Sequence, residues 1–204
     1  MLRGPKEKKE RALGEKLFLK GERCLSPKCA VVRRPYRPGV HGRDRRRALS
    51  EFGQQLQEKQ KIRLTYGLKE AQFRRFFKGA LKKGGESNII LEKLERRLDN
   101  VIFRLGFAVS RSIARQTVSH SHILVNNKIV NIPSYEVKIG DIITIKPTSK
   151  NLPLFKELSA QLKKYEPPSW LALDKEKLEA KVASLPSNIQ TPFNINLVVE
   201  YYSR

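Results

Sequence analysis

The sequence has few acidic residues and no long apolar run. Its 20 aspartates and glutamates stand against 42 lysines and arginines, which gives 204 residues a formal charge of +22. No run of about 18 apolar residues occurs, so no membrane-spanning helix is expected. The basic N-terminal residues lack the apolar core of a secretory signal. A basic amphipathic membrane helix and a lipidation motif are also missing, and we therefore expect no membrane partner.

Cysteine is scarce, and known catalytic motifs are missing. The two cysteines, Cys24 and Cys29, are too few for a disulfide framework and predict a reduced, intracellular protein. We find no glycine-rich phosphate loop and no nucleophile elbow. A thiol–imidazole pair between these cysteines and His41 would lie in a basic stretch without a supporting core. We expect no enzymatic activity.

Positive charge is what the sequence has in excess. A soluble small domain usually carries a net charge of about 2–8 in magnitude. A compact domain with a charge of +22 repels itself unless a polyanion lies against it. Nucleic acid fits best as that partner, because each lysine or arginine that neutralises a phosphate also releases a counterion.

Residues 1–47 are interpreted as an irregular basic arm, because prolines and glycines interrupt any long element. A stretch this charged stays solvated and disordered unless a partner orders it. The interleaved Tyr36 and His41 favour a specific bound shape. The predicted RNA contacts of the arm are Arg33, Arg34, Arg37, Arg43, Arg45, Arg46 and Arg47.

Residues 48–93 are predicted to be helical. Ser50 can cap a helix that runs to Gly67, and a second helix is expected over residues 69–82. The phenylalanines of the second helix are interpreted as core residues rather than as platforms for RNA bases. On the first helix, Lys59 and Arg63 are predicted RNA contacts.

Residues 94–156 change from a helical to a strand period. Apolar residues recur every three or four positions from Ile90 to Leu105, and Ser110 can cap a following helix. Strands are expected at 122–126, 129–130, 135–137 and 142–145. Predicted RNA contacts here are Arg111, Arg115, Gln116, His120, His122, Asn126 and Lys128. Alternatively, the helix residues form a solvated face and the two histidines are turn residues.

Residues 157–204 form a C-terminal segment that packs back on the body. We expect a helix over 152–165, a strand at 170–173 and a short helix from Asp174 to Leu185. Residues 195–202 are too apolar for a loose tail. The fold class is therefore α+β: a mostly helical N-terminal domain with the basic arm, and an inserted helix–helix–strand module with a small antiparallel sheet.

Residues 94–126, LERRLDNVIFRLGFAVSRSIARQTVSHSHILVN, resemble the RNA-binding module named after bacterial ribosomal protein S-four. Residues 132–135 and 138–141 fit the same module. It also occurs in pseudouridine synthases, tyrosyl-tRNA synthetase tails and a heat-shock ribosome-rescue protein. The module alone therefore leaves open an RNA-modifying enzyme or a free RNA-binding stress factor.

The rest of the chain resembles the S-four family itself, at residues 17–24, 38–42, 56–61, 66–67, 72–74 and 199–204. The resemblance implies a structural constituent of the small, 30S-type ribosomal subunit. It further implies a primary binder of 16S-type rRNA that nucleates subunit assembly. A monomer within the subunit is implied, near the mRNA entrance and beside ribosomal proteins S-five and S-three. The expected location is the ribosome of the bacterial cytoplasm, or an organelle ribosome whose protein the organelle itself encodes.

The chain departs from many relatives in one respect. They carry a CxxC pair upstream of the second cysteine pair, and the four thiolates hold zinc. This chain keeps Cys24 and Cys29, but Glu7 and Glu10 stand at the upstream positions. A mixed site, or one with His41 as a ligand, stays chemically open, since zinc takes four ligands. We expect no zinc and no other cofactor.

Overall fold

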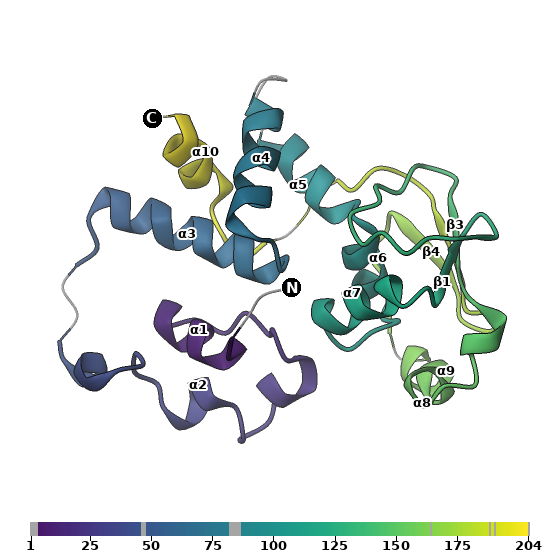
Figure 1. The fold of residues 1–204 in the computed structure, drawn as a ribbon, viewed down its shortest axis with the longest axis horizontal. Coiled ribbons are helices and arrows are strands. Elements are labelled where there is room, and N and C mark those ends of the chain that lie inside the picture. The colour runs from purple at the N-terminus through teal and green to yellow at the C-terminus, as the bar shows by residue number, and fades with distance from the viewer. Residues whose placement is uncertain are drawn as a thin grey trace. The chain divides into compact units, whose positions relative to one another are not determined.

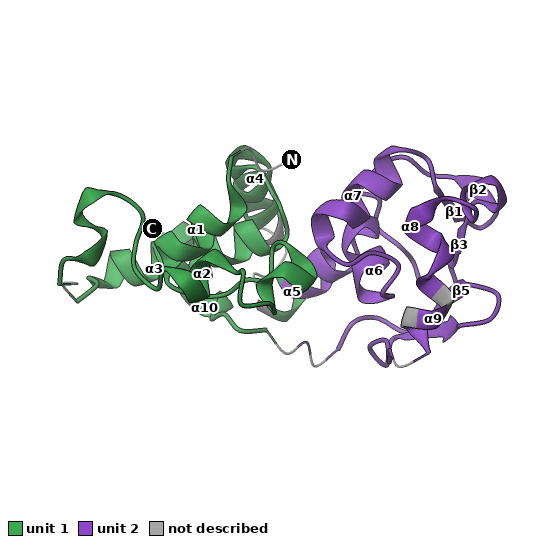
Figure 2. Cartoon of the chain, turned by 90° about the horizontal axis from the view of Figure 1, so that it is seen from below, with its two compact units in different colours: residues 1–90, 190–204 green, residues 91–189 purple. Residues whose placement is uncertain are grey.

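The computed structural model describes residues 4–45, 48–81, 87–163, 165–187, 189 and 191–203. The chain divides into two compact units, residues 1–90 with 190–204 and residues 91–189 (Figure 2). The predicted RNA contacts Arg46 and Arg47 lie outside the described residues. Within the described ranges, no helix has the length and apolar character needed to cross a membrane.

The basic arm contains short helices between its proline and glycine breaks (Figure 1). Helix α1 spans Lys6–Leu13 and α2 spans Ala30–Arg33, with single 3-10 turns η1 at Gly21–Cys24 and η2 at Val40–Arg43. Pro5 precedes α1, and Gly14 ends it in the left-handed conformation at φ 82°. Leu17, Cys24 and Cys29 are buried, so part of the arm packs inside the first unit.

Three further helices lie in the first unit. Helix α3 spans Glu51–Thr65, α4 spans Glu70–Leu81 and α10 spans Ile195–Ser203. Helix α10 packs on α3 and α4 (Figure 1). The Ser50 hydroxyl accepts a hydrogen bond from the Gly53 amide at 3.2 Å, which confirms the predicted cap. Phe73 and Phe77 are fully buried, as expected of core residues. The apolar C-terminal residues dock on the body as a helix.

The predicted helix from Ile90 to Leu105 is wrong as a single element. Helix α5 spans Ser87–Glu95, α6 spans Leu98–Arg104 and α7 spans Arg111–Ser119. Between α5 and α6, Arg97 is extended and pairs with Glu136 in an isolated antiparallel bridge. The Leu98 amide donates to the Tyr135 carbonyl at 2.8 Å, so these backbone bonds replace helical ones. The predicted strand at 135–137 is reduced to this bridge.

The second unit contains an antiparallel sheet in the order β2-β1-β3-β5-β4. The strands are β1 Ile123–Val125, β2 Lys128–Ile129, β3 Ile142–Ile145, β4 Leu171–Asp174 and β5 Glu179–Val182. The predicted helix from Asp174 is wrong, because β5 lies there and pairs with β3 and β4. Asp174 instead accepts the amides of Glu176 and Lys177 in the turn between the strands. Residues beyond 157 thus extend the sheet of the module.

A single apolar core joins α6, α7 and the sheet, with Leu98, Ile102 and Ile143 fully buried. The predicted helix over 152–165 is divided at Glu157 into α8 (Pro153–Lys156) and α9 (Leu158–Leu162), after the turn η3 (Pro147–Ser149). Gly106 has φ +75°, and a Cβ there would lie 2.9 Å from the Leu162 side chain. Glycine is therefore required where α6 ends.

Candidate nucleic-acid interface

Tyr36 organises the cations of the arm. The guanidinium carbons of Arg11 and Arg43 lie 5.0 and 4.8 Å from the centre of its ring, within cation–π range. Nε of Arg11 also donates to the backbone carbonyls of Arg34 at 3.0 Å and Tyr36 at 3.1 Å. The Arg43 hydrogen bond lowers the pKa of the Tyr36 hydroxyl. Tyr36 thus contacts two guanidinium groups, one from α1 and one from the later part of the arm.

The predicted RNA contacts of the arm that the structure describes are exposed. They are Arg33, Arg34, Arg37, Arg43 and Arg45. An exposed guanidinium offers several donors in a planar fork, which matches phosphate oxygens. The arm therefore presents the geometry that phosphate contacts need.

The thiols of Cys24 and Cys29 lie in a corner of the arm where Glu7 already has ion-pair partners. Both thiols are buried, and the pKa of Cys24 is raised because burial desolvates the thiolate. Glu7 pairs with Arg23 at 2.9 Å and Lys20 at 3.7 Å. Among the residues that the structure describes, no three His, Cys, Asp or Glu side chains are grouped to hold a metal ion.

Glu10 holds this corner in a different way. Its Oε1 accepts the amides of Leu17 at 3.0 Å and Leu19 at 3.1 Å, and its side chain is fully buried. Burial raises the pKa of the Glu10 carboxyl above its usual value, although the two amide bonds act against that rise. A hydrogen-bonded carboxyl group thus ties α1 to the loop before Cys24.

Lys59 and Arg63 make internal contacts on α3. Lys59 is 5% exposed, and its ammonium lies 2.7 Å from Glu70 Oε1 and 4.6 Å from the centre of the Tyr201 ring. Nε of Arg63 donates to Gln60 at 2.9 Å and lies 3.4 Å from Glu70. The Lys59 ammonium is buried and contacts residues of α4 and α10. The structure therefore offers no exposed group at Lys59 to support the predicted RNA contact.

A buried ionic network lies beneath the predicted contacts of the second unit. Arg97 pairs with Asp99 through two hydrogen bonds of 3.1 and 2.8 Å, and Arg104 pairs with Glu95 through two of 2.8 and 2.9 Å. Sequence reasoning missed Glu95, Asp99 and Asn100. Their signal was the presence of charged and amide side chains within an otherwise apolar helical pattern.

This network positions the two arginines of α7. Nε of Arg111 donates to Asn100 Oδ1 at 2.8 Å, and its guanidinium carbon lies 4.4 Å from the centre of the Phe103 ring. Nη1 of Arg115 lies 3.6 Å from Asp99 Oδ2, and the Arg115 side chain is 25% exposed. The neighbouring Gln116 is exposed. The structure therefore brings Arg111 and Arg115 together over one set of buried anchors.

His120 and His122 lie next to each other, with ring centres 6.1 Å apart. His120 is exposed, whereas His122 is half-buried and forms a 2.9 Å hydrogen bond with the Ser149 hydroxyl through Nδ1. Burial, then the nearby His120 and Lys146, lower the pKa of His122, so its ring is neutral at neutral pH. His120 offers the more accessible ring.

Asn126 and Lys128 occupy the turn between β1 and β2. The Asn126 amide nitrogen donates to Asp141 Oδ1 at 2.8 Å, and its oxygen accepts the Ile142 amide at 2.9 Å. Asn126 has φ +50° and Asn127 has φ +62°. The amide of Asn126 thus closes the turn on β3, whereas Lys128 is exposed.

Comparison with known proteins places this arrangement in a family. Residues 1–96 match the Ribosomal protein S4/S9 N-terminal domain, and residues 96–143 match the S4 domain. A small ribosomal subunit protein uS4 from Caldicellulosiruptor saccharolyticus is 51% identical over 204 residues, which cover 98% of each chain.

Other relatives carry the same name. The uS4 protein of Heliobacterium modesticaldum is 51% identical over 94% of this chain and 93% of its own. That of Halothermothrix orenii is 49% identical over 99% of this chain and 98% of its own. The match extends over both compact units, including the arm and the C-terminal helix. The chain therefore belongs to the small ribosomal subunit protein uS4 family.

Proposed function

We propose that this protein is a structural, non-enzymatic constituent of the small ribosomal subunit and a primary binder of 16S-type rRNA. The observation that carries the proposal is the 51% identity to a uS4 protein over 98% of both chains. The exposed arginines of the arm and the anchored arginines of α7 supply the chemistry. Nucleation of subunit assembly follows if the protein binds the rRNA before other proteins join.

The mechanism is electrostatic and geometric. Arginine and lysine side chains neutralise phosphates where RNA helices approach one another, which lets a junction settle in one geometry. An A-form helix offers little that a side chain can read in its deep groove, so recognition rests on shape and on unpaired nucleotides. The Arg111 guanidinium is held by Asn100 before RNA arrives, so less side-chain freedom is lost on binding.

We further propose a finer placement, which the resemblance to the family supports. The protein would lie as a monomer near the mRNA entrance, where the arm arginines would also meet mRNA, and beside ribosomal proteins S-five and S-three. The named relatives are bacterial, which supports a ribosome of the bacterial cytoplasm.

Binding to a 16S-type rRNA fragment at several salt concentrations tests the proposal. If about six to ten phosphates are engaged, affinity should fall by about 10³–10⁵-fold between 50 and 200 mM salt. A nearly flat response would contradict the phosphate contacts. Sedimentation separates this function from that of a free stress factor, because a ribosomal constituent stays with 30S particles in one-to-one amount after a moderate salt wash.

A charge-matched pair of variants locates the surface. Replacing Arg33, Arg37 and Arg45 with Gln should weaken binding to the rRNA fragment. The control replaces Lys156, Lys177 and Lys181 with Gln, which removes the same charge from exposed positions of the second unit. Equal losses in the two variants would mean that total charge, rather than the arm, sets the affinity.

A further inference from the structure

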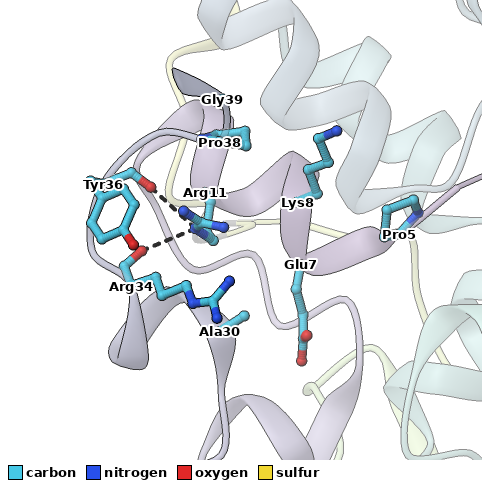
Figure 3. Close-up of a pocket in the computed structure, with 9 residues that line it drawn as sticks. All are labelled: Pro5, Glu7, Lys8, Arg11, Ala30, Arg34, Tyr36, Pro38 and Gly39. Carbon is cyan, nitrogen blue, oxygen red and sulfur yellow. Dashed lines mark hydrogen bonds between the residues drawn. The ribbon is translucent and has the colours of Figure 1, made fainter. Parts of the chain in front are cut away.

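A cavity of about 430 Å³ opens on the first unit between α1, α2 and the segment that follows α2 (Figure 3). Residues of the basic arm line this cavity. The sequence predicted phosphate contacts in the arm but no pocket. The lining residues come from three short segments of the arm: Pro5, Glu7, Lys8, Arg11, Ala30, Arg34, Tyr36, Pro38 and Gly39.

The lining combines apolar walls with positive charge. Pro5, Ala30 and Pro38 provide the apolar part, and Tyr36 adds an aromatic ring. Lys8, Arg11 and Arg34 provide three cations. The carboxylate of Glu7 is paired with Arg23 and Lys20, and Figure 3 shows it pointing away from Tyr36. The pocket is therefore positively charged, with surfaces that a simple inorganic anion would not cover.

The central cation is fixed before any ligand arrives. Arg11 donates to the carbonyls of Arg34 and Tyr36, and its guanidinium lies against the Tyr36 ring (Figure 3). A guanidinium plane held in place is a surface on which an unpaired RNA base stacks, and Tyr36 holds Arg11 in this way. The volume suits one such group, since pockets for small ligands span about 300–1,000 Å³.

We propose that this pocket, defined by Arg11, Arg34 and Tyr36, takes one unpaired nucleotide of the ribosomal RNA. The base lies against the Arg11 guanidinium and the apolar wall, and its phosphate lies near Arg34. The inference rests on the proposed function and assigns to it a site that reads a single nucleotide, in addition to the phosphate contacts of the exposed arginines.

A variant that fills the pocket without changing charge tests the inference. Ala30→Phe places a ring in the cavity, whereas the control Ala12→Phe adds the same ring at an exposed position of α1. Each full-length protein is bound to the rRNA fragment, and the RNA is probed chemically at its bases and 2′-hydroxyls. The wild type should protect an unpaired nucleotide that Ala30→Phe leaves reactive, with the other protections kept. Affinity should fall about tenfold in Ala30→Phe and stay unchanged in Ala12→Phe.

A second pair keeps the test decisive if Ala30→Phe perturbs the fold, as judged by circular dichroism. Arg34→Gln, at a pocket cation, should expose the same nucleotide, whereas Lys28→Gln, at an exposed lysine outside the pocket, should not.

The two proposals fail in different ways. If the wild type does not bind the rRNA fragment, the proposed function fails and the pocket has no ligand of this kind. If the wild type binds, but folded Ala30→Phe and Arg34→Gln give the reactivity pattern of the wild type at every unpaired nucleotide, only the pocket proposal is overturned.

Discussion

Nε of Arg111 donates a hydrogen bond of 2.8 Å to Oδ1 of Asn100. On its other side, Asn100 donates through Nδ2 to the carboxylate of Glu95, also at 2.8 Å. Position 100 must therefore accept one hydrogen bond and donate another, which an amide does and a carboxylate does not. Glu95 is 1% exposed, so this link ties a proposed RNA-binding arginine to the interior of its unit.

Asn100→Asp should damage both stability and RNA binding. The new carboxylate would face Glu95 at hydrogen-bond distance in a buried site, and we expect a loss of about 2–4 kcal/mol in the free energy of unfolding. Urea denaturation measures this loss. The control Asn127→Asp changes an exposed asparagine and should stay within about 0.5 kcal/mol of the wild type. Equal losses of stability in the two variants would refute the role of Asn100 as the link between Arg111 and Glu95.

Lys59→Met should lower stability without a specific effect on RNA binding. The change removes the 2.7 Å pair with Glu70 and the contact with Tyr201 that join α3, α4 and α10. We expect a loss of about 1–3 kcal/mol. The exposed Lys78 near the end of α4 gives the control Lys78→Met. If Lys59→Met unfolds like the wild type but binds the rRNA fragment less tightly, Lys59 contacts RNA after all.

Local signals in the sequence predicted much of the fold. Ser50 and Ser110 precede α3 and α7, and both side chains accept the expected hydrogen bonds. Strands β1 and β3 lie where the apolar period changes from helical to alternating. These features depend on residues that are close in the sequence, so they can be predicted from a single sequence.

Features that depend on distant partners were not predictable. Nothing near Arg97 indicates that Glu136 will pair with it and interrupt the helix. Strand β5 has four residues, and its pairing with β3 decides its conformation. The candidate RNA-binding residues also depend on distant partners. The sequence around Lys59 predicts a surface cation, whereas the structure pairs it with Glu70 of another helix.

Asn126→Gly should destabilise the second unit although it keeps the backbone relaxed. Glycine adopts φ +50° readily, so the variant removes only the bonds to Asp141 and Ile142. We expect a loss of about 1–2 kcal/mol. Asn127→Gly also relieves a positive φ and removes no side-chain hydrogen bond to a described residue, so it should be neutral or stabilising by thermal unfolding. A neutral Asn126→Gly variant that binds RNA weakly would instead support a direct contact by the Asn126 amide.

Glu10 predicts a particular pH dependence. Burial raises the pKa of its carboxyl in the folded state above the unfolded value of about 4.3. The folded protein therefore holds this proton more tightly than the unfolded chain. The stability that results is fully present below the unfolded pKa and is lost as pH rises through the folded pKa. Urea unfolding between pH 4 and pH 8, at about one-unit steps, measures the slope.

Two substitutions separate the charge of Glu10 from its hydrogen bonds. Glu10→Gln keeps an acceptor for the Leu17 and Leu19 amides and removes the charge, so it should be at least as stable as the wild type at pH 7 and flatten the pH dependence. Glu10→Ala leaves both amides unpaired and should cost about 1–3 kcal/mol. The exposed Glu22→Gln is the control. We expect a metal chelator to leave the melting temperature unchanged, because the amides of Leu17 and Leu19 already bind the Glu10 carboxyl group. A lower melting temperature with chelator, together with a destabilised Glu10→Gln, would show that Glu10 and the two thiols share a metal ion.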